Sequence, residues 1–429
     1  MRAYGIVLLL SVLLVRDLSA QQIAIQAGHV VDPATGTSLA NQIILIDNGT
    51  ITDVGSNLDI SSVDQVIDLS DSWVMPGLMD AHVHLTLNIP HNLGVGISLA
   101  AFYLTESNAL RALRGAKNAR YVLEAGFTTV KDIGNDGNYA AIDLRRAIEY
   151  GWIEGPTLIN TGKIIAPFGG QSSGISPDQP HVWEFEYIDA DSPDEVRKAV
   201  RQNIYYGANA IKLVADNSAF YYSEEEIRAA VEEAGKAGLT VAVHAYGGEP
   251  ARNVIMAGAH AIEHGWFLED ELLRLMKDKG TFLVGTDFPL EHYQAMVMFF
   301  DDPEGISQTT IDRLRRAHEI GVKMAFGTDV VVDLPGRNRG ELALDFLAVW
   351  EEAGVPAAKI LESMTTNAAE LLRVQHERGA IATGQFADIV ATPGNPLDDI
   401  QELRSIHFVM KEGKVIRSDS RTVGETGSR

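Results

Sequence analysis

Short apolar runs alternate with amphipathic segments along most of the chain. Between the runs, apolar residues recur three and four positions apart, as in Val196, Val200 and Ile204, and this spacing predicts helices with one buried face. The runs predict eight strands, at 74–79, 127–130, 157–160, 210–214, 240–244, 261–264, 281–284 and 322–326. Strands in strict alternation with helices predict an α/β fold, and eight of them predict a (β/α)8 TIM-like barrel.

Capping residues mark where several of the helices begin. Ser192 to Glu195 gives a serine N-cap, a proline at the first helical position and a glutamate that completes a capping box. Ser223 and Glu226 repeat this signal at the next helix. Two more helices are predicted after the eighth strand, at about 340–353 and 356–373.

Both ends of the chain change to a β pattern. Asn48-Gly49 lies between two apolar runs and predicts a hairpin, because both turn positions favour residues that accept a positive φ. Short apolar segments return near the C-terminus, at 389–391, 407–410 and 415–416. We expect residues 21–74 and 378–429 to join into a small β-sandwich companion domain, beside a barrel of residues 75–377.

The first twenty residues are typical of a secretory signal. Arg2 supplies the positive start, Ile6 to Val15 is an apolar run broken only by Ser11, and Leu18 to Ala20 is a slightly imperfect cleavage site before Gln21. The run is too short to span a membrane comfortably, so a retained anchor is the minority alternative. We expect an exported protein, periplasmic or secreted, that is cleaved near Ala20 and has no stable membrane insertion.

Composition excludes several classes of function. The net charge of −23 argues against nucleic-acid binding, which needs a basic face. The absence of cysteine excludes disulfides, thiolate zinc sites and a cysteine nucleophile. Any metal site must therefore use histidine, carboxylate or a less usual ligand. The oligomeric state stays open, and a homo-oligomer is compatible with the sequence.

Side chains that can bind a metal stand where the predicted strands end. His82 and His84 follow the first strand and lie on one face of it, because side chains alternate along a strand. Four more candidates stand on or just after later strands: Lys212, His244, His264 and Asp329. A lone histidine at such a place is more often structural. Because the C-terminal ends of barrel strands meet at one mouth, the combination is hard to explain by packing.

These residues belong to longer stretches that match a known superfamily. The stretches are Pro76 to His84, Ile211-Lys212, His244, Ile262 to Gly265, Gly327 to Asp329, Thr366 to Ala369 and Gly384 to Val390. They resemble the amidohydrolase superfamily over essentially the whole mature chain. Within it, the chain is similar to the imidazolonepropionase-like and Xaa-Pro dipeptidase-like hydrolases, many of which are exported.

The resemblance implies a binuclear metal centre. His82, His84 and Asp329 would hold the more buried ion, and His244 and His264 would hold the other. Ligands that are all nitrogen or oxygen suit zinc, with manganese or cobalt as alternatives.

The resemblance also implies that Lys212 is carboxylated and, together with a hydroxide, bridges the two ions. A carbamate is an anionic ligand with two oxygens, whereas a free ammonium would repel cations. The alternative for Lys212 is a salt-bridged lysine at a strand end. Asp329 would take a proton from the hydroxide and pass it to the leaving amine.

Two assignments of residues to the site have an alternative. Gly-Thr-Asp occurs at 285–287 and at 327–329, and we choose Asp329 because only it closes the count of eight strands. Asp287 would then be a loop-capping or substrate residue. Tyr246 follows His244 by two positions, and either donates a hydrogen bond to the scissile carbonyl or packs at the barrel rim. Glu263 is expected to support the neighbouring ligand rather than react.

Substrate contacts are expected in the loops at the mouth. Phe168 is a candidate apolar wall, and Arg337 and Arg339 are candidates to bind a substrate carboxylate, although a solvated pair is the more common explanation for two loop arginines. His181 and His292 are expected to be surface histidines.

Together these features favour a metal-dependent hydrolase that acts on a small-molecule amide. The substrate would be a dipeptide or an N-acyl amino acid, cut to release the C-terminal amino acid. The same centre could serve a cyclic-amide, lactone or organophosphate hydrolase. A non-catalytic binding protein on this fold is the alternative from another class, and missing ligands would have signalled it.

Overall fold

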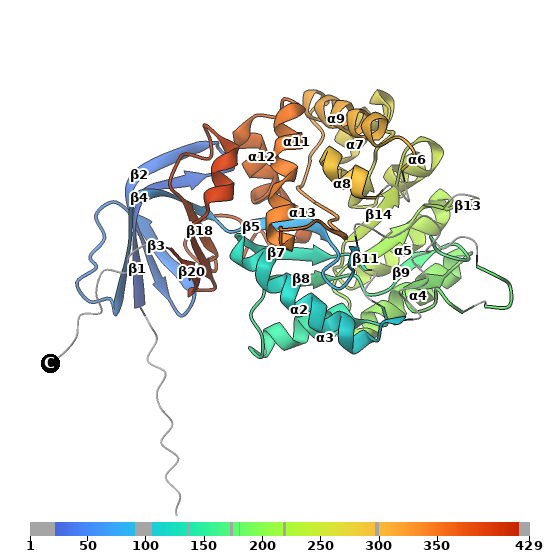
Figure 1. The fold of residues 1–429 in the computed structure, drawn as a ribbon, viewed down its shortest axis with the longest axis horizontal. Coiled ribbons are helices and arrows are strands. Elements are labelled where there is room, and N and C mark those ends of the chain that lie inside the picture. Colours follow the sequence, from blue (N-terminus) through green and yellow to red (C-terminus); the bar gives the residue numbers. More distant parts are fainter. Residues whose placement is uncertain are drawn as a thin grey trace, which may run out of the picture.

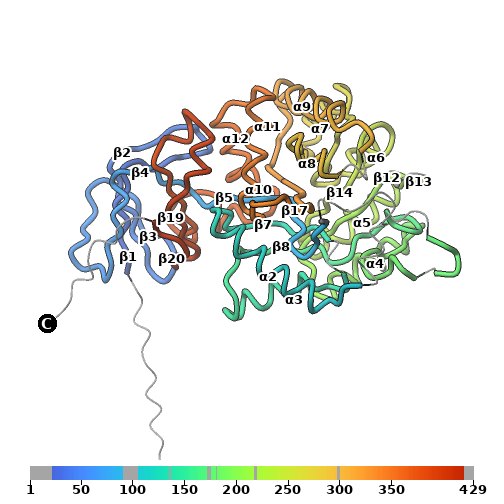
Figure 2. The backbone as a smooth tube through the Cα atoms, viewed as in Figure 1, coloured from blue at the N-terminus to red at the C-terminus, as the bar shows by residue number. Residues whose placement is uncertain are grey.

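The computed structural model describes residues 22–90, 105–134, 137–171, 175–179, 181–217, 220–296 and 300–419. The predicted signal peptide, residues 1–20, lies outside them. A barrel and a smaller sheet of strands from both ends of the chain lie next to each other, and Figures 1 and 2 show the sheet at one end of the long axis. Within the described part of the chain, no helix is both long and apolar enough to cross a membrane.

Seven of the eight predicted barrel strands are regular strands. They are β5 (Leu78–Val83), β7 (Phe127–Asp132), β8 (Thr157–Asn160), β11 (Ile211–Val214), β14 (Val241–Ala245), β15 (Ala261–His264) and β16 (Phe282–Val284). Neighbours pair in parallel, and the Ala210 amide donates to the Asn160 carbonyl (3.1 Å) where β8 passes to β11. The predicted barrel is confirmed.

The eighth position is occupied by residues 322–326, which are extended but are not a regular strand. On one side the Leu283 amide donates to the Lys323 carbonyl (2.9 Å) and Ala325 donates back to Leu283 (3.0 Å). On the other side the Ala81 amide donates to the Phe326 carbonyl (2.8 Å). The segment therefore closes the barrel between β16 and β5 with a few bonds to each, too few for a continuous ladder.

Helices alternate with the barrel strands and pack outside them. They are α2 (Asn108–Glu124), α3 (Ala140–Glu149), α4 (Pro193–Tyr206), α5 (Glu224–Lys236), α6 (Gly248–Met256), α7 (Asp270–Lys279), α8 (Leu290–Ala295) and α9 (Pro303–Ile320). The predicted caps form: the Ser192 hydroxyl accepts from the Glu195 amide, and Ser223 and Glu226 make both bonds of a capping box.

The C-terminal helices differ from their prediction. Four short helices replace the two expected ones: α10 (Arg339–Leu344), α11 (Phe346–Glu352), α12 (Ala357–Ser363) and α13 (Thr366–Leu372). Thr365, at φ −134° and ψ −91°, leaves helical geometry and separates the last two. A continuous apolar pattern did not reveal these breaks.

Short strands also lie between the main elements. They are β6 (Ile89–Pro90), β9 (Ile164–Ala166), β10 (Tyr187–Asp189), β12 (Asp216–Asn217), β13 (Phe220–Tyr221) and β17 (Val332–Asp333), and a 3-10 turn η1 (Ile400–Ser405) precedes β19. β9 extends the barrel sheet beside β11, and β6 pairs with β17.

The companion domain is one seven-stranded sheet, ordered β20-β19-β18-β4-β1-β2-β3. Its strands are β1 (Gln22–Asp32), β2 (Thr37–Asp47), β3 (Thr50–Gly55), β4 (Gln65–Pro76), β18 (Ile389–Thr392), β19 (Phe408–Lys411) and β20 (Lys414–Ser418). β18 pairs with β4, which confirms that the two termini share a sheet. The predicted hairpin turn is present, with positive φ at Asn48 and Gly49.

This sheet folds back so that its two ends share one core. Ile44 and Ile51 from the first strands pack in the same buried cluster as Phe408 from β19. The Ile51 amide also donates to the Gln385 carbonyl (2.8 Å), which ties the β3 edge to the C-terminal segment. The result is a sandwich-like packing of one curled sheet.

Candidate metal centre and active site

Two histidines and an aspartate converge at the mouth of the barrel. His82 and His84 stand at the end of β5, and the Nε2 atoms lie 3.6 and 3.1 Å from Asp329 Oδ1. One ligand atom from each residue lies within 4.8 Å of those of the other two, which is close enough for one metal ion. Burial acts to raise the pKa of Asp329, but His82, His84 and Lys212 outweigh it and lower that pKa.

In both imidazole rings, the Nδ1 atom, which points away from Asp329, is hydrogen bonded to another residue. His82 Nδ1 donates to Glu263 Oε2 (2.7 Å), and His84 Nδ1 donates to the carbonyl oxygen of Gly134 (2.6 Å). Glu263 also accepts from Lys131 Nζ (3.1 Å). Burial acts to raise the pKa of Glu263, yet Lys131 and His82 lower it to about 2. These bonds fix which nitrogen of each ring faces Asp329, as is usual for metal-binding histidines.

Asp80 connects the two segments that carry the cluster. Its carboxylate accepts from the amides of His82 (3.0 Å) and Thr328 (3.1 Å) and from the Thr328 hydroxyl (2.7 Å). Asp329 follows directly and has φ of +53°, a strained conformation for a residue other than glycine. The strained backbone turns Asp329 towards the histidines instead of along the strand.

His264 and His244 complete the ring of imidazoles. His264 Nδ1 and Thr286 Oγ1 are hydrogen bonded (2.8 Å), while the His264 ring lies 5.1 Å from that of His82 and 4.6 Å from that of His244. Both His264 (φ +69°) and Thr286 (φ +48°) have a left-handed backbone. Strained residues gather at this mouth, a pattern common at functional sites.

Lys212 is 2% exposed, and among the described residues its Nζ atom has no hydrogen-bond partner. Its charge acts on His82, His264 and Asp329. Burial lowers its pKa to about 8, an effect that Glu263 and Asp329 reduce but do not cancel. A buried, unpartnered amine is costly to keep charged. The position suits a lysine that is chemically modified or that binds an ion.

Asp216 is a site residue that sequence reasoning missed. Its Oδ1 lies 3.2 Å from His244 Nε2, and its Oδ2 accepts from the Tyr246 amide (2.9 Å). It stands in β12, four positions after Lys212, so a search for carboxylates just beyond that strand would have found it. Asp216 therefore places a carboxylate beside the His244 ring, which also contacts the rings of His264 and Tyr246.

The two Gly-Thr-Asp sequences have different surroundings. Asp287 is 1% exposed and pairs with Arg313, which is itself fully buried. Arg313 also donates to the carbonyls of His264 (3.0 Å) and Gly285 (3.2 Å). The structure therefore brings Asp329 to the histidines and places Asp287 behind them, where it holds the backbone that carries His264.

A cavity of about 330 Å³ opens above the histidines. All six candidate metal ligands line it: His82, His84, Lys212, His244, His264 and Asp329. The other lining residues are Leu87, Ile89, Ile164, Gln171, Tyr187, Tyr246, Trp266, Phe288, Met296, Phe300 and Val331. The ring of Tyr246 lies 4.5 Å from that of His244, and burial raises the pKa of its hydroxyl, which therefore stays protonated. Tyr246 is placed where it can donate a hydrogen bond.

The other predicted substrate residues do not line this cavity. Phe168 is 62% exposed and packs edge-on against Trp183. Arg337 pairs with Glu291 and Asp345 (both 2.6 Å). Their predicted contact with substrate has no support from this geometry.

Arg339 is buried, is not among the residues that line the cavity, and donates to the carbonyl of Leu87, which does line it (3.0 Å). Of the two histidines predicted on the surface, His181 is there, with a side chain 76% exposed. His292 is fully buried, so that prediction is wrong. Its place on the apolar face of α8 brings it against Phe288 and Phe346.

Comparison with known proteins identifies the family. The model of the amidohydrolase family matches residues 73–416. The chain belongs to the amidohydrolase family. Ochratoxinase of Aspergillus niger is 29% identical over 92% of this chain and 86% of its own length. The crystal structure of a Xaa-Pro dipeptidase with bound methionine is 31% identical, with a TM-score of 0.82 over 93% of this chain and 100% of that one.

Family membership and these relatives make the chain a hydrolase that acts on amide bonds. Imidazolonepropionase of Caldanaerobacter subterraneus, 23% identical over 84% of this chain and 86% of its own length, belongs to the same group of relatives. Amidohydrolases generally bind metal, and the residues of this chain fit that requirement. Ligand atoms that are each about 2.0–2.2 Å from zinc lie roughly 3–3.6 Å apart, as the nitrogens of His82 and His84 do from Asp329 Oδ1.

Proposed function

We propose that this amidohydrolase is a binuclear metal-dependent hydrolase of small amides. His82, His84 and Asp329 would hold one ion, and His244 and His264 the other. The observation that carries the proposal is the buried, unpartnered Nζ of Lys212 in the midst of these ligands. Carboxylated by CO₂, Lys212 would lose its positive charge and gain two oxygens, which suits a bridge between two cations.

Asp329 and Tyr246 would supply the acid–base and hydrogen-bonding roles in catalysis. Two divalent ions, most suitably zinc, would supply Lewis acidity that polarises an amide carbonyl and lowers the pKa of water. Asp329 takes the proton of the attacking water and delivers it to the leaving nitrogen, as general base and then general acid. The protonated hydroxyl of Tyr246 donates a hydrogen bond to the carbonyl oxygen as negative charge develops there.

The relatives favour, as the substrate class, amides whose hydrolysis releases an amino acid. Ochratoxinase and a Xaa-Pro dipeptidase are each similar to this chain over more than nine-tenths of it. Small dipeptides and N-acyl amino acids are therefore the first class to test. A lactone or phosphotriester could be accommodated by the same ligands, and is the second.

The test is turnover by the mature chain loaded with zinc in bicarbonate. The panel holds Xaa-Pro, Xaa-Arg and Xaa-Phe dipeptides, N-acyl amino acids, neutral amides, lactones and a phosphotriester, with Asp329→Asn beside the wild type. Turnover of an amide that is lost in the variant supports the proposal. Turnover of only lactones or phosphotriesters, or of nothing, would contradict amide hydrolysis as the activity.

We also propose that the chain is exported and cleaved near Ala20. The first residue of the mature protein, read by mass spectrometry of material secreted or released from the periplasm, tests this. A chain that keeps residues 1–20 would contradict it.

A further inference from the structure

We propose that two exposed aromatic residues beside the mouth, Tyr221 and Phe267, form an aromatic shelf that receives an apolar substituent of the substrate too long for the cavity. The inference rests on the proposed function and narrows its substrate class to amides that carry a long alkyl chain. The chain can belong to the acyl group or to the amine, and two series of substrates distinguish these sources.

Tyr221 is placed by the hairpin that follows the strand of Lys212. β12 and β13 pair antiparallel, and Asp216 lies directly opposite Tyr221. Side chains of directly opposite residues lie on the same face of such a pair. Since Asp216 Oδ1 lies 3.2 Å from His244 Nε2, Tyr221 stands on the face of the hairpin that is turned to the candidate metal centre. Tyr221 is nevertheless 55% exposed.

Phe267 comes to the mouth from the segment after β15. Its amide donates to the Tyr246 carbonyl (2.8 Å), and the Tyr246 amide donates to Asp216 Oδ2 (2.9 Å). The backbone of Tyr246 therefore connects the two segments that carry the aromatic shelf. The ring of Phe267 lies 6.1 Å from that of Tyr246, and Phe267 is 54% exposed.

Close backbone packing fixes the position of Phe267. A Cβ atom on Gly247 would lie 2.7 Å from the Phe267 carbonyl oxygen, so the two segments can approach this closely only because residue 247 is glycine. The shelf residue is therefore held in place before any ligand binds.

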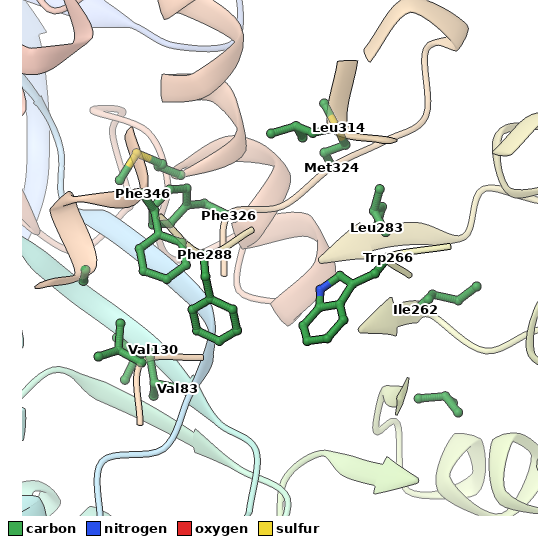
Figure 3. Close-up of a cluster of buried hydrophobic side chains, with 14 of the residues drawn as sticks. Val83, Val130, Ile262, Trp266, Leu283, Phe288, Leu314, Met324, Phe326 and Phe346 are labelled. Atoms are coloured by element: carbon green, nitrogen blue, oxygen red, sulfur yellow. The ribbon is translucent and has the colours of Figure 1, made fainter. Parts of the chain in front are cut away.

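The aromatic shelf continues a wall of aromatic rings that lines the cavity. Trp266 is buried, its Nε1 donates to the Gly285 carbonyl (3.2 Å), and its ring lies 4.9 Å from that of Tyr246. Figure 3 shows Trp266 next to Phe288, and the two rings lie 6.3 Å apart in an edge-on arrangement. Aromatic rings thus follow one another from Phe288 inside the cavity to Phe267 outside it.

The size of the cavity indicates what the shelf would contact. Neither Tyr221 nor Phe267 lines the cavity, whose volume of about 330 Å³ is at the lower end of the range for ligand sites. A substituent that fills this volume and continues through the mouth beside Tyr246 would meet the shelf. Single exposed apolar side chains are ordinary on protein surfaces, so it is the continuity with the cavity wall that points to a ligand. An alkyl chain gains by leaving water against such rings.

The experiment measures hydrolysis of two series by the mature chain loaded with zinc. One series is N-acylglycines with acyl chains of increasing length, from acetyl to decanoyl. The other is N-acetyl-L-amino acids with unbranched side chains of increasing length, from alanine to 2-aminodecanoic acid. In one of the two we expect kcat/KM to rise about two- to fourfold for each added methylene, as for partial to full burial of that group. No rise in either series would overturn the inference.

Removal of the aromatic shelf tests where the chain binds. Tyr221→Ser combined with Phe267→Ser should fold, because both residues are more than half exposed. The ratio of kcat/KM for the longest and the shortest member of the series should fall at least 10-fold relative to the wild type. Tyr221→Phe combined with Phe267→Leu, which keeps an apolar surface, should retain most of the ratio. An unchanged ratio in the serine double variant would overturn the inference.

Tyr205 provides a matched control variant. It is 83% exposed and lies at the C-terminal end of α4, where the chain turns back to the start of β11, so it is at the opposite end of the barrel from the mouth. Tyr205→Ser should keep the ratio of the wild type. An equal fall of the ratio in Tyr205→Ser would contradict binding at the shelf.

Binding separates this inference from the proposed function. If no amide is hydrolysed, the proposed function fails, and calorimetry with the zinc-loaded chain decides the inference alone. The longest member of one series should bind the wild type at least 10-fold more tightly than the shortest, and this difference should be lost in the serine double variant. Equal binding of long and short members, or a difference that the double variant keeps, would overturn the inference.

Discussion

Replacing Asp287 by asparagine should destabilise the protein without removing its chemistry. Asp287 and Arg313 are 1% and 0% exposed, so their ion pair is screened little by water. The variant would leave a buried guanidinium without its counter-charge, a loss of about 3–5 kcal/mol in similar cases. The two carbonyls that Arg313 also contacts would keep part of their support.

The measurement is the free energy of unfolding in urea at pH 7.5, read from the midpoint with an unchanged slope. Asp329→Asn is the matched control, because it makes the same change in the second Gly-Thr-Asp sequence. It should lower kcat/KM by about 10²–10⁴-fold, as expected when a general acid–base is lost. Asp287→Asn should lower it far less at temperatures where the variant stays folded.

A double variant tests the reasoning from the pair itself. Asp287→Asn with Arg313→Met removes both charges, so it should be more stable than Asp287→Asn alone, because no unpaired charge is left buried. Stability equal to wild type in Asp287→Asn, together with loss of turnover, would refute this account. It would make Asp287 the carboxylate of the site.

The contacts of Glu263, Asp216 and His260 lead to three further predictions. Glu263→Gln should weaken metal affinity about 10–100-fold, measured by competition with a chelator, because His82 Nδ1 would lose its anionic acceptor. Asp216→Asn should weaken the affinity for one ion of the two and leave the other unchanged, since among the site histidines of the described residues it contacts His244 alone. Burial and Arg373 lower the pKa of His260 to about 4 from 6.5, so its contribution to stability is full above pH 6.5 and is lost as pH falls through about 4. His260→Asn, which can still accept from the Val241 amide, should show a smaller loss in urea unfolding between pH 7 and pH 4.

The barrel could be predicted because its signals are local. Buried parallel strands are short apolar runs, and the helices between them begin at capping residues that form the expected bonds. The eighth strand position shows the limit of this reasoning. Residues 322–326 have the apolar pattern of a strand, but only a few bonds to each neighbour form, and pairing is a property of both partners.

Features that depend on distant contacts could not be predicted. His292 is buried partly because its ring packs against Phe346, which is 54 positions further along the chain. Arg337 and Arg339 follow the eighth strand position, yet their partners lie in other segments and hold them away from the cavity. Asp216 was missed because its role comes from the distance to His244, which is 28 positions further along the chain.

The most direct test of the central proposal is the metal content of the chain against its activity. Zinc-free protein is titrated with zinc in bicarbonate, and bound metal and amide hydrolysis are measured at each step, with Lys212→Ala as the control. We predict that hydrolysis saturates at two ions per chain and that Lys212→Ala loses both the second ion and the activity. Full hydrolysis without metal, or unchanged metal content and activity in Lys212→Ala, would contradict a binuclear centre bridged by this lysine.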